Sequence, residues 1–366
     1  MTPDAAADRY ARQRLIPGWD QRRVAEATAI VIGAGAVGNE VAKNLALAGV
    51  GQLILCDPDV VATSNLSRTA MLRADDVGRF KAEAVAGALM GLVPGVVAQA
   101  RVADLAAGAG LGELADASVV LSCVDSIRAR MRLLGRCVLA GAALIDGGTH
   151  AFGGEIRIRL GPDEPCYGCT LSAHERGVSD VPWSCYGMSP DGPEPASIAI
   201  AALIGSWMSH AALQVMLGAP PSYRILSIDA VTGRSSTVAT EQDQTCPYHR
   251  QLAGPVTTVP VSNRASVAEF LTLLGPDDEP FTWEQFTVGW RCSTCASYAT
   301  KLDEHAGTGS SVSLCTRCGG LIRARSSQRL RDARPEASLA ELGVAPEEIL
   351  PVRVPGGEYE CQRLSR

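Results

Sequence analysis

The feature that most constrains this chain is a glycine pattern set between an apolar run and an amphipathic run. Ala29–Ile32 has the length of a buried strand and leads into Gly33-x-Gly35-x-x-Gly38. The next stretch, Asn39–Gly49, has the apolar spacing of a helix. Glycines at such a junction let the backbone turn sharply and let a phosphate approach the helix N-terminus. The pattern predicts a nucleotide-binding strand–loop–helix unit.

An acidic residue follows the next apolar strand at the distance expected for a ribose-binding side chain. Leu53–Leu55 is that strand, and Asp57 lies 19 residues after Gly38. Together these features indicate an α/β protein with a Rossmann-like, mainly parallel sheet and helices on both faces. Taken alone, they also fit a nicotinamide-dependent oxidoreductase.

Basic side chains follow Asp57 at positions where a dehydrogenase does not need them. Asp59 completes D-P-D, Ser64–Arg68 reads S-N-L-S-R, and Lys81 closes V-G-R-F-K. An enzyme that cleaves ATP between the α- and β-phosphates needs such cations, because the leaving pyrophosphate concentrates negative charge. The spacing therefore favours a nucleotide-cleaving enzyme over an oxidoreductase.

A further carboxylate and a basic segment complete the candidate site. The predicted strand Ser118–Cys123 ends close to Asp125, and ligands gather at the carboxyl ends of parallel strands. Asp125 is thus either a metal ligand or, with Ser126, a cap for the helix predicted over Arg128–Leu139. Near the start, Arg9–Gln13 reads R-Y-A-R-Q, which by itself is a solvated basic segment.

In these ordered motifs the chain resembles the ThiF/MoeB/HesA family, the prokaryotic relatives of ubiquitin-activating enzymes. The resemblance covers roughly Arg9 to Arg250. It implies ATP- and Mg²⁺-dependent adenylylation of the C-terminal glycine of a ubiquitin-like or sulfur-carrier protein that ends in Gly-Gly. It also implies a homodimer. A non-catalytic adaptor of the same fold is the alternative, and the basic and acidic motif residues speak against it.

The resemblance assigns roles to individual residues. Asp57 would hold the ribose, Arg68 and Lys81 would face the phosphates, and Asp125 would bind Mg²⁺. Arg12 would reach the phosphates bound by the neighbouring subunit. The full set of nucleotide-binding positions that it implies is Gly33, Gly35, Ala36, Gly38, Asp57, Asp59, Ser64, Asn65, Arg68, Lys81, Asp125 and Ser126.

Two sets of metal-ligand residues predict two structural zinc sites. Pairs spaced by two residues suit tetrahedral Zn²⁺ bound by thiolate and imidazole, with no open position. The first set is Cys166, Cys169, Cys246 and His249. The second set, with 19 residues between its pairs, is Cys292, Cys295, Cys315 and Cys318, and it predicts a small C-terminal zinc-ribbon domain.

The segment 172–195, between the first two pairs, is rich in proline and glycine. By resemblance it is the family's crossover loop, and it contains Cys185. This cysteine is either a nucleophile that forms a thioester or a bystander. Cys56, Cys123 and Cys137 lie in strand or helix patterns and are expected to be small core residues.

The strand pattern continues after Asp125. Ala143–Asp146 and Glu155–Leu160 are predicted strands, and the glycines between them are expected to form turns: Gly147, Gly148, Gly153 and Gly154. Ala196–Leu217 is the most apolar long run, and the polar residues within it favour a buried helix over a membrane span.

Length and charge limit the remaining choices. The 366 residues allow an adenylation domain at 1–253, a linker at 254–265 and the zinc-ribbon domain at 266–366. The net charge of −6 argues against nucleic acid or an anionic membrane as a partner. Paired cysteines and the polar first residues predict a cytoplasmic protein. Arginines in Leu321–Arg334 could bind nucleic acid or an acidic protein, and we favour a solvated basic face.

Overall fold

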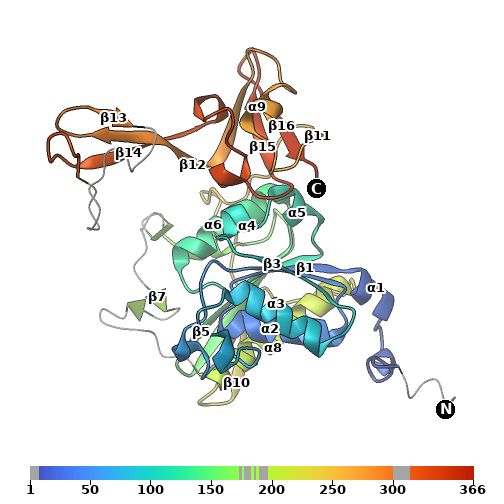
Figure 1. The fold of residues 1–366 in the computed structure, drawn as a ribbon. Coiled ribbons are helices and arrows are strands. Elements are labelled where there is room, and N and C mark those ends of the chain that lie inside the picture. Colours follow the sequence, from blue (N-terminus) through green and yellow to red (C-terminus); the bar gives the residue numbers. More distant parts are fainter. Residues whose placement is uncertain (1–7, 173–174, 177–182, 185–186, 189–196, 300–313) are drawn as a thin grey trace. The chain divides into compact units, whose positions relative to one another are not determined.

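The structure, a computed structural model, describes residues 8–172, 175–176, 183–184, 187–188, 197–299 and 314–366. The chain divides into two compact units, Met1–Leu252 and Ala253–Arg366 (Figure 1). We describe each unit by itself.

Unit 1 is built on an eight-stranded sheet with the order β10-β9-β6-β5-β4-β1-β2-β3. From β3 to β5 neighbouring strands pair in parallel, and from β5 to β10 they pair antiparallel. The strands are β1 (Thr28–Ile32), β2 (Gln52–Cys56), β3 (Val97–Arg101), β4 (Val119–Ser122), β5 (Leu144–His150), β6 (Gly153–Arg159), β9 (Ile225–Asp229) and β10 (Arg234–Val238). The order reverses beside β1, which is where ligands bind in open α/β sheets. The predicted fold class is confirmed.

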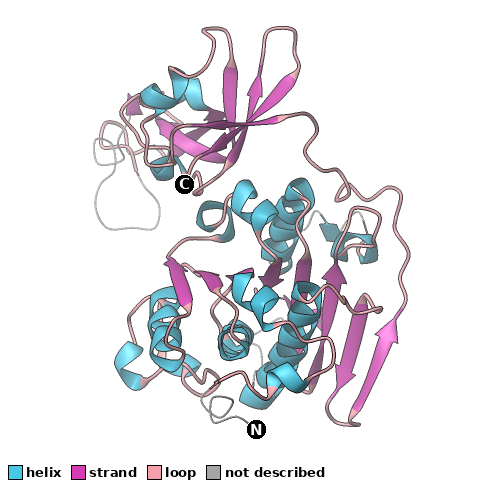
Figure 2. Cartoon of the chain, turned by 90° about the vertical axis from the view of Figure 1, so that its right-hand side faces the viewer, coloured by secondary structure: helices cyan, strands magenta, loops and turns pink. Residues whose placement is uncertain are grey.

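Helices cover both faces of this sheet (Figure 2). In Figure 1, α2, α3 and α8 lie on one side, and α4, α5 and α6 lie on the other. Their bounds, with that of α1, are α1 (Gln21–Glu26), α2 (Ala36–Ala48), α3 (Lys81–Leu92), α4 (Leu105–Gly108), α5 (Leu111–Asp116), α6 (Ile127–Ala140) and α8 (Ile198–Met216). The predicted end of α2 is explained by Gly49, whose φ of 91° belongs to the left-handed region that favours glycine.

Helix α8 is a core helix of unit 1. By length and composition alone it is apolar enough to cross a membrane. In the fold, however, it packs on α2 and on β5, and Ile204 and Met208 are fully buried. The prediction of a buried helix agrees with this packing.

The sequence predicts that the glycines between β5 and β6 form turns, and this prediction is wrong. Gly147 and Gly148 lie within β5, and Gly153 and Gly154 lie within β6. A Cβ on Gly154 would approach the Gly148 carbonyl oxygen to 2.3 Å. These residues are glycine because the paired strand and α8 approach the backbone closely, which no local sequence pattern reports.

Unit 2 contains a sheet with the order β11-β16-β15-β12-β13, and β14 pairs with β12. Its elements are β11 (Val256–Val259), α9 (Val267–Leu271), β12 (Glu279–Cys292), β13 (Tyr298–Ala299), β14 (Ile322–Arg329), β15 (Ile349–Arg353) and β16 (Tyr359–Leu364). Phe270, Leu339 and Leu350 are fully buried in its core.

The expected linker at 254–265 is wrong in part. Its residues Val256–Val259 form β11, which pairs in parallel with β16 near the other end of the unit. The strand closes the sheet of unit 2 and therefore belongs to that unit.

The hairpin glycines generate the first prediction. Gly154→Ala should destabilise unit 1 by about 1–3 kcal/mol, because the new methyl group would overlap the Gly148 carbonyl. Gly161→Ala is the control, since a Cβ there meets nothing within 4 Å. Urea unfolding of both variants measures the difference. Equal midpoints for the two variants would mean that the hairpin adjusts without cost.

Candidate nucleotide site and metal centres

The glycine loop joins the end of β1 to the start of α2, and two of its glycines are sterically required. Gly33 has φ 93°, and a Cβ on it would lie 2.6 Å from the Cys123 carbonyl oxygen. A Cβ on Gly38 would lie 1.8 Å from the Gly33 carbonyl oxygen. Gly35 is different, because a Cβ there meets nothing within 4 Å. The space above Gly35, at the N-terminus of α2, is therefore open to a ligand.

Asp57 ties the glycine loop to the end of β2. Its carboxylate accepts hydrogen bonds from the Ala34 N–H at 2.7 Å and from the Asp59 N–H at 2.8 Å. Burial raises the pKa of the Asp57 carboxyl, and these two hydrogen bonds act against that rise. The residue predicted to hold a ribose is thus also the residue that fixes the loop.

Asp59 extends the connection to α3. The Lys81 Nζ lies 2.7 Å from Asp59 Oδ2, and the Lys81 N–H donates to the Asp59 carbonyl oxygen at 2.9 Å. The Lys81 side chain is only 14% exposed, whereas that of Asp59 is 65% exposed. Lys81 is therefore held at the loop side of α3, close to the residues that surround Asp57.

The S-N-L-S-R loop is anchored on α2 by a residue that the sequence analysis missed. Asn39, directly after Gly38 and fully buried, accepts a hydrogen bond from the Met71 N–H at 2.9 Å. Within the loop, Arg68 donates to the Ser64 carbonyl at 2.6 Å. The Asn65 side chain caps the turn by accepting from the Ala62 N–H at 2.9 Å. The only sequence signal for Asn39 is its polar character on a helix face that is otherwise apolar.

A second missed residue, Arg130, holds the turn that carries Asp125. The buried Arg130 forms an ion pair with the buried Asp146 and donates to the Val124 carbonyl at 2.7 Å. Asp125 itself is exposed just after β4. Of the two capping candidates, Ser126 caps α6 by accepting from the Ala129 N–H at 3.2 Å. The Asp125 carboxylate is thus left for another partner.

Arg12 lies far from the glycine loop of its own chain. It precedes a short 3₁₀ turn and is exposed. Its neighbour Arg9 donates to the Leu92 carbonyl, at the end of α3. Tyr10 packs beside Gly49, at the end of α2. The glycine loop lies at the other end of α2, and a 13-residue helix spans about 20 Å.

Four described cysteines lie outside the metal clusters, and one of them, Cys361, is buried in unit 2. Cys185 lies outside the described residues. Cys56 and Cys137 are buried, and burial raises the pKa of each thiol to about 12. Burial also raises the pKa of Cys123 strongly. These three thiols behave as the predicted core residues and are poor nucleophiles.

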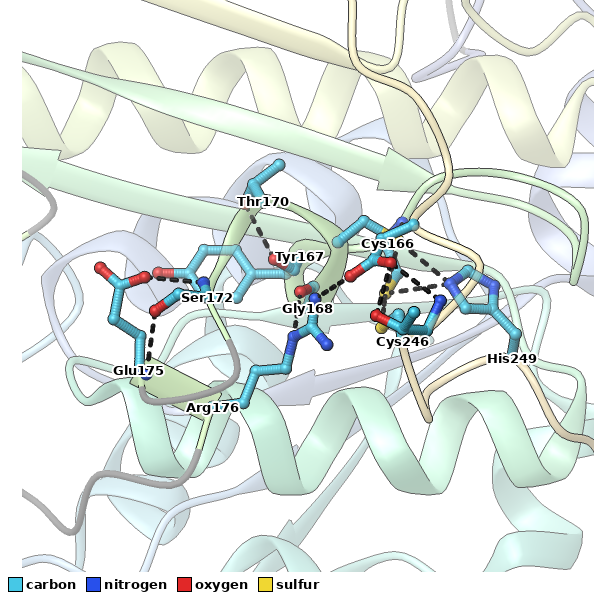
Figure 3. Close-up of polar contacts among 12 residues, drawn as sticks. Cys166, Tyr167, Gly168, Thr170, Ser172, Glu175, Arg176, Cys246 and His249 are labelled. Atoms are coloured by element: carbon cyan, nitrogen blue, oxygen red, sulfur yellow. Dashed lines mark hydrogen bonds and ion pairs between the residues drawn. The ribbon is translucent and has the colours of Figure 1, made fainter.

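The first metal-ligand set comes together as a compact cluster (Figure 3). The Cys166 Sγ lies 3.7 Å from the Sγ atoms of both Cys169 and Cys246, and the His249 Nε2 lies 3.1 Å from the Cys169 Sγ. Tetrahedral Zn–S bonds of about 2.3 Å place two sulfurs about 3.8 Å apart. The spacing of the sulfurs therefore fits a tetrahedral metal ion.

Neighbouring groups orient the ligands of this cluster. The His249 Nδ1 lies 2.9 Å from the Pro162 carbonyl oxygen and 2.9 Å from the Gln242 Nε2, and these contacts orient the ring with Nε2 toward the cysteine sulfurs. Arg176 donates from Nε to the Gly168 carbonyl at 2.7 Å and pairs with Asp243 (Figure 3). These contacts join the two loops that supply the ligands.

A third residue that the sequence analysis missed, Arg159, lies beside this cluster. It is 4% exposed, and its Nε and Nη2 atoms have no hydrogen-bond partner among the described residues. It lines a cavity of about 20 Å³ together with Cys166 and Asp146. Three thiolates, one imidazole and Zn²⁺ carry a net charge of about −1, so a buried guanidinium nearby compensates that charge.

The second set also forms a cluster, in unit 2. The Cys292 and Cys318 Sγ atoms are 3.4 Å apart, and those of Cys295 and Cys315 are 3.8 Å apart. All four ligand atoms lie within 4.8 Å of one another. Four thiolates on two turns fit a closed structural site.

The sheet, the glycine loop and the Asp57–Asp59–Lys81 contacts define a nucleotide-binding α/β protein with an accessory metal-ligand cluster in the same unit. More narrowly, the chain belongs to the ThiF family, which matches residues 8–248. This finding agrees with the resemblance seen in the motifs.

Individual relatives agree with this assignment. A molybdopterin-synthase adenylyltransferase of Salmonella typhimurium is 31% identical over 61% of this chain and 88% of that protein. A SAMP-activating enzyme E1 of Haloferax volcanii is 29% identical over 66% of this chain and 87% of that protein. The mouse adenylyltransferase and sulfurtransferase MOCS3 is 37% identical, and this chain matches 36% of its length. By name these relatives transfer adenylyl groups or activate proteins, which does not favour an oxidoreductase or an adaptor.

Solved structures share the fold. A structure of E. coli MccB with MccA-N7isoASN superposes with a TM-score of 0.55 at 17% identity, covering 68% of this chain and 77% of that one. At that identity the likeness concerns the fold alone. It supports the mixed sheet of unit 1.

The metal clusters generate the second prediction. The protein should contain two zinc ions per chain, and Arg159→Gln should release one of them to a chelator at least about tenfold faster, because a buried negative site loses its countercharge. The cluster in unit 2 is the internal control and should release its zinc unchanged. Stopped-flow chelation measures both phases. If the zinc ion of the unit 1 cluster leaves Arg159→Gln at the wild-type rate, Arg159 does not stabilise that site.

Proposed function

We propose that this chain uses ATP and Mg²⁺ to adenylylate the C-terminal glycine of a ubiquitin-like or sulfur-carrier protein that ends in Gly-Gly. Its relatives are named for that class of reaction. The reduced cysteines of both clusters suit a cytoplasmic enzyme. The zinc sites would be structural, since each set supplies four ligands and leaves no open position.

The observation that carries the proposal is the chain of contacts from the glycine loop to Lys81. Asp57 holds Ala34 and Asp59, and Asp59 holds Lys81. A nicotinamide site needs the glycine loop and the acid, but it does not need a lysine fixed beside them. Lys81 is placed to exchange its carboxylate partner for a phosphate, and this exchange suits stabilisation of a leaving pyrophosphate.

In the proposed reaction a carboxylate oxygen of the carrier attacks the α-phosphorus of ATP. The bond from that phosphorus to the bridging oxygen of the β-phosphate breaks, and pyrophosphate leaves with its electron pair. The product is an acyl-adenylate, from which a thiol or sulfide then displaces AMP. Lys81 and Arg68 neutralise the phosphates, Asp57 holds the ribose, and Asp125 would hold Mg²⁺.

The position of Arg12 supports a composite site in a homodimer. Within one chain Arg12 lies near the ends of α2 and α3 that point away from the glycine loop. Beside it, Leu15 is 81% exposed and Ile16 is 50% exposed. Exposed apolar side chains also flank the Asp59–Lys81 pair, namely Val60 and Phe80. A two-fold dimer that covers both apolar areas would bring Arg12 of one protomer to the phosphates of its partner.

The third prediction tests the chemistry. With a Gly-Gly-ending sulfur-carrier protein present, the enzyme should exchange labelled pyrophosphate into ATP, and Asp125→Ala should reduce the rate at least about a hundredfold by removing a metal ligand. Asp277→Ala, which removes an exposed carboxylate of unit 2, is the matched control. Normal exchange by Asp125→Ala would remove that residue from the mechanism.

The fourth prediction tests the composite site. Arg12→Ala and Lys81→Ala should each be nearly inactive. When the two variants exchange subunits, about half of the dimers are mixed, and each mixed dimer has one intact site of two. Activity should therefore recover to roughly a quarter of wild type. If no activity returns although native mass spectrometry detects mixed dimers, Arg12 does not act across a dimer interface.

A further inference from the structure

In unit 2, strand β12 pairs with β13 and with β14, and one face of these three strands carries a concentrated positive charge. In the register of the sheet, Arg291 pairs with both Arg323 and Tyr298, and Gly289 pairs with Arg325. Residues that pair directly, or lie two apart on a strand, point to the same side of a sheet. These five residues therefore share one side, which we call the ribbon face: Gly289, Arg291, Tyr298, Arg323 and Arg325.

The arginines of the ribbon face differ from the other arginines nearby. Arg329 pairs with Glu279, Arg331 donates to two backbone carbonyls, and Arg334 lies near Glu336. Arg291, Arg323 and Arg325 are exposed, and none has an ion-pair partner among the described residues. Like charges directly opposite each other destabilise a sheet by a few tenths of a kcal/mol to about 1 kcal/mol. Stability therefore does not explain the Arg291–Arg323 pair.

Tyr298 lies flat across this face. A Cβ on Gly289 would lie 2.1 Å from the Tyr298 Oη and 2.4 Å from its Cζ, so the ring occupies the space of the missing side chain. The hydroxyl donates to the Val288 carbonyl at 2.9 Å, which fixes the ring. The residue is still 46% exposed. One side of the ring therefore rests on the strand, and the other side is available for stacking.

We propose that the ribbon face binds single-stranded nucleic acid. An immobilised tyrosine ring offers a platform for one base, and the surrounding guanidinium groups suit the phosphates on either side of that base. Because the whole chain has a net charge of −6, we expect nucleic acid to bind at this local positive surface and not over the rest of the protein. For Arg323 and Arg325 the proposal departs from the solvated basic face that the sequence favours.

An acidic protein is the competing occupant, and the composition of the face speaks against it. Protein interfaces are centred on a buried apolar core with few charges. The ribbon face instead has three unpaired cations around one aromatic ring. The proposal does not depend on the adenylylation reaction.

The test is fluorescence anisotropy of the zinc-loaded, full-length protein with labelled oligonucleotides of about 20 uridines or thymidines. Binding through three phosphate contacts should weaken with salt with a log–log slope of about −2. Arg323→Gln with Arg325→Gln should reduce that slope to about −0.7. Tyr298→Ala should weaken binding at least about fivefold, whereas Tyr298→Phe keeps the ring and should retain most of the affinity.

Two controls make the result decisive. Arg264→Gln with Arg334→Gln removes the same charge elsewhere in unit 2 and should leave the affinity unchanged. Zinc content measured for every variant shows that the ribbon is intact. Binding of either the RNA or the DNA probe with these losses supports the proposal. It is overturned if neither probe binds below about 100 µM, if Tyr298→Ala binds as wild type, or if polyglutamate competes as well as unlabelled oligonucleotide.

Discussion

The nucleotide site depends on the two hydrogen bonds that the Asp57 carboxylate accepts from the Ala34 and Asp59 backbones. The first bond fixes the glycine loop at the end of β1, and the second fixes the turn after β2. Through Asp59 the same connection reaches Lys81 at the start of α3. Because one buried carboxylate holds three segments, loss of Asp57 would disturb the proposed phosphate-binding positions as well as the proposed ribose contact. Preorganised charge of this kind is what phosphoryl and adenylyl transfer require from a protein.

The second half of unit 1 depends on buried charge. Arg130 pairs with Asp146 and holds the turn that precedes Asp125. The Asp146 Oδ1 has no hydrogen-bond partner among the described residues, and it lines the same small cavity as Arg159. The cavity measures about 20 Å³, which is enough for one water molecule, and its walls are mainly apolar. Asp146 and Arg159 therefore line the same cavity, and Asp146 pairs with the arginine that holds the Asp125 turn, whereas Arg159 lies beside the metal ligand Cys166.

Much of this architecture could be predicted from the sequence because the signals are local. Gly33 directly follows the first strand and Gly38 comes five residues later at the start of a helix, and the spacing of the paired cysteines predicts the metal clusters. The misses are all non-local. The short β11 (Val256–Val259) becomes a strand only because β16, more than a hundred residues later, offers it a partner. Arg159 alternates with Glu155 and Arg157 as a solvent-facing residue would, yet it is buried and lines a cavity with Cys166.

In the candidate site, too, the contacts that the sequence did not predict join residues far apart in the chain. Each motif residue could be identified from its own segment, but the sequence could not show that Asn39 anchors the Arg68 loop or that Arg130 holds the Asp125 turn. Both contacts join residues whose pairing depends on how a helix packs against a loop. Nor could charge counting separate Arg323 and Arg325 from their paired neighbours, since that distinction rests on strand register.

The central claim is that this chain activates a carboxylate as an acyl-adenylate, and an oxygen-18 transfer experiment tests it most directly. A Gly-Gly-ending carrier protein labelled with oxygen-18 in its C-terminal carboxylate is incubated with the enzyme, ATP, Mg²⁺ and a thiol. If the carboxylate attacks the α-phosphorus, the AMP released by the thiol carries one oxygen-18 atom, which mass spectrometry detects. Unlabelled AMP, or ADP with labelled phosphate, would contradict adenylylation at this site.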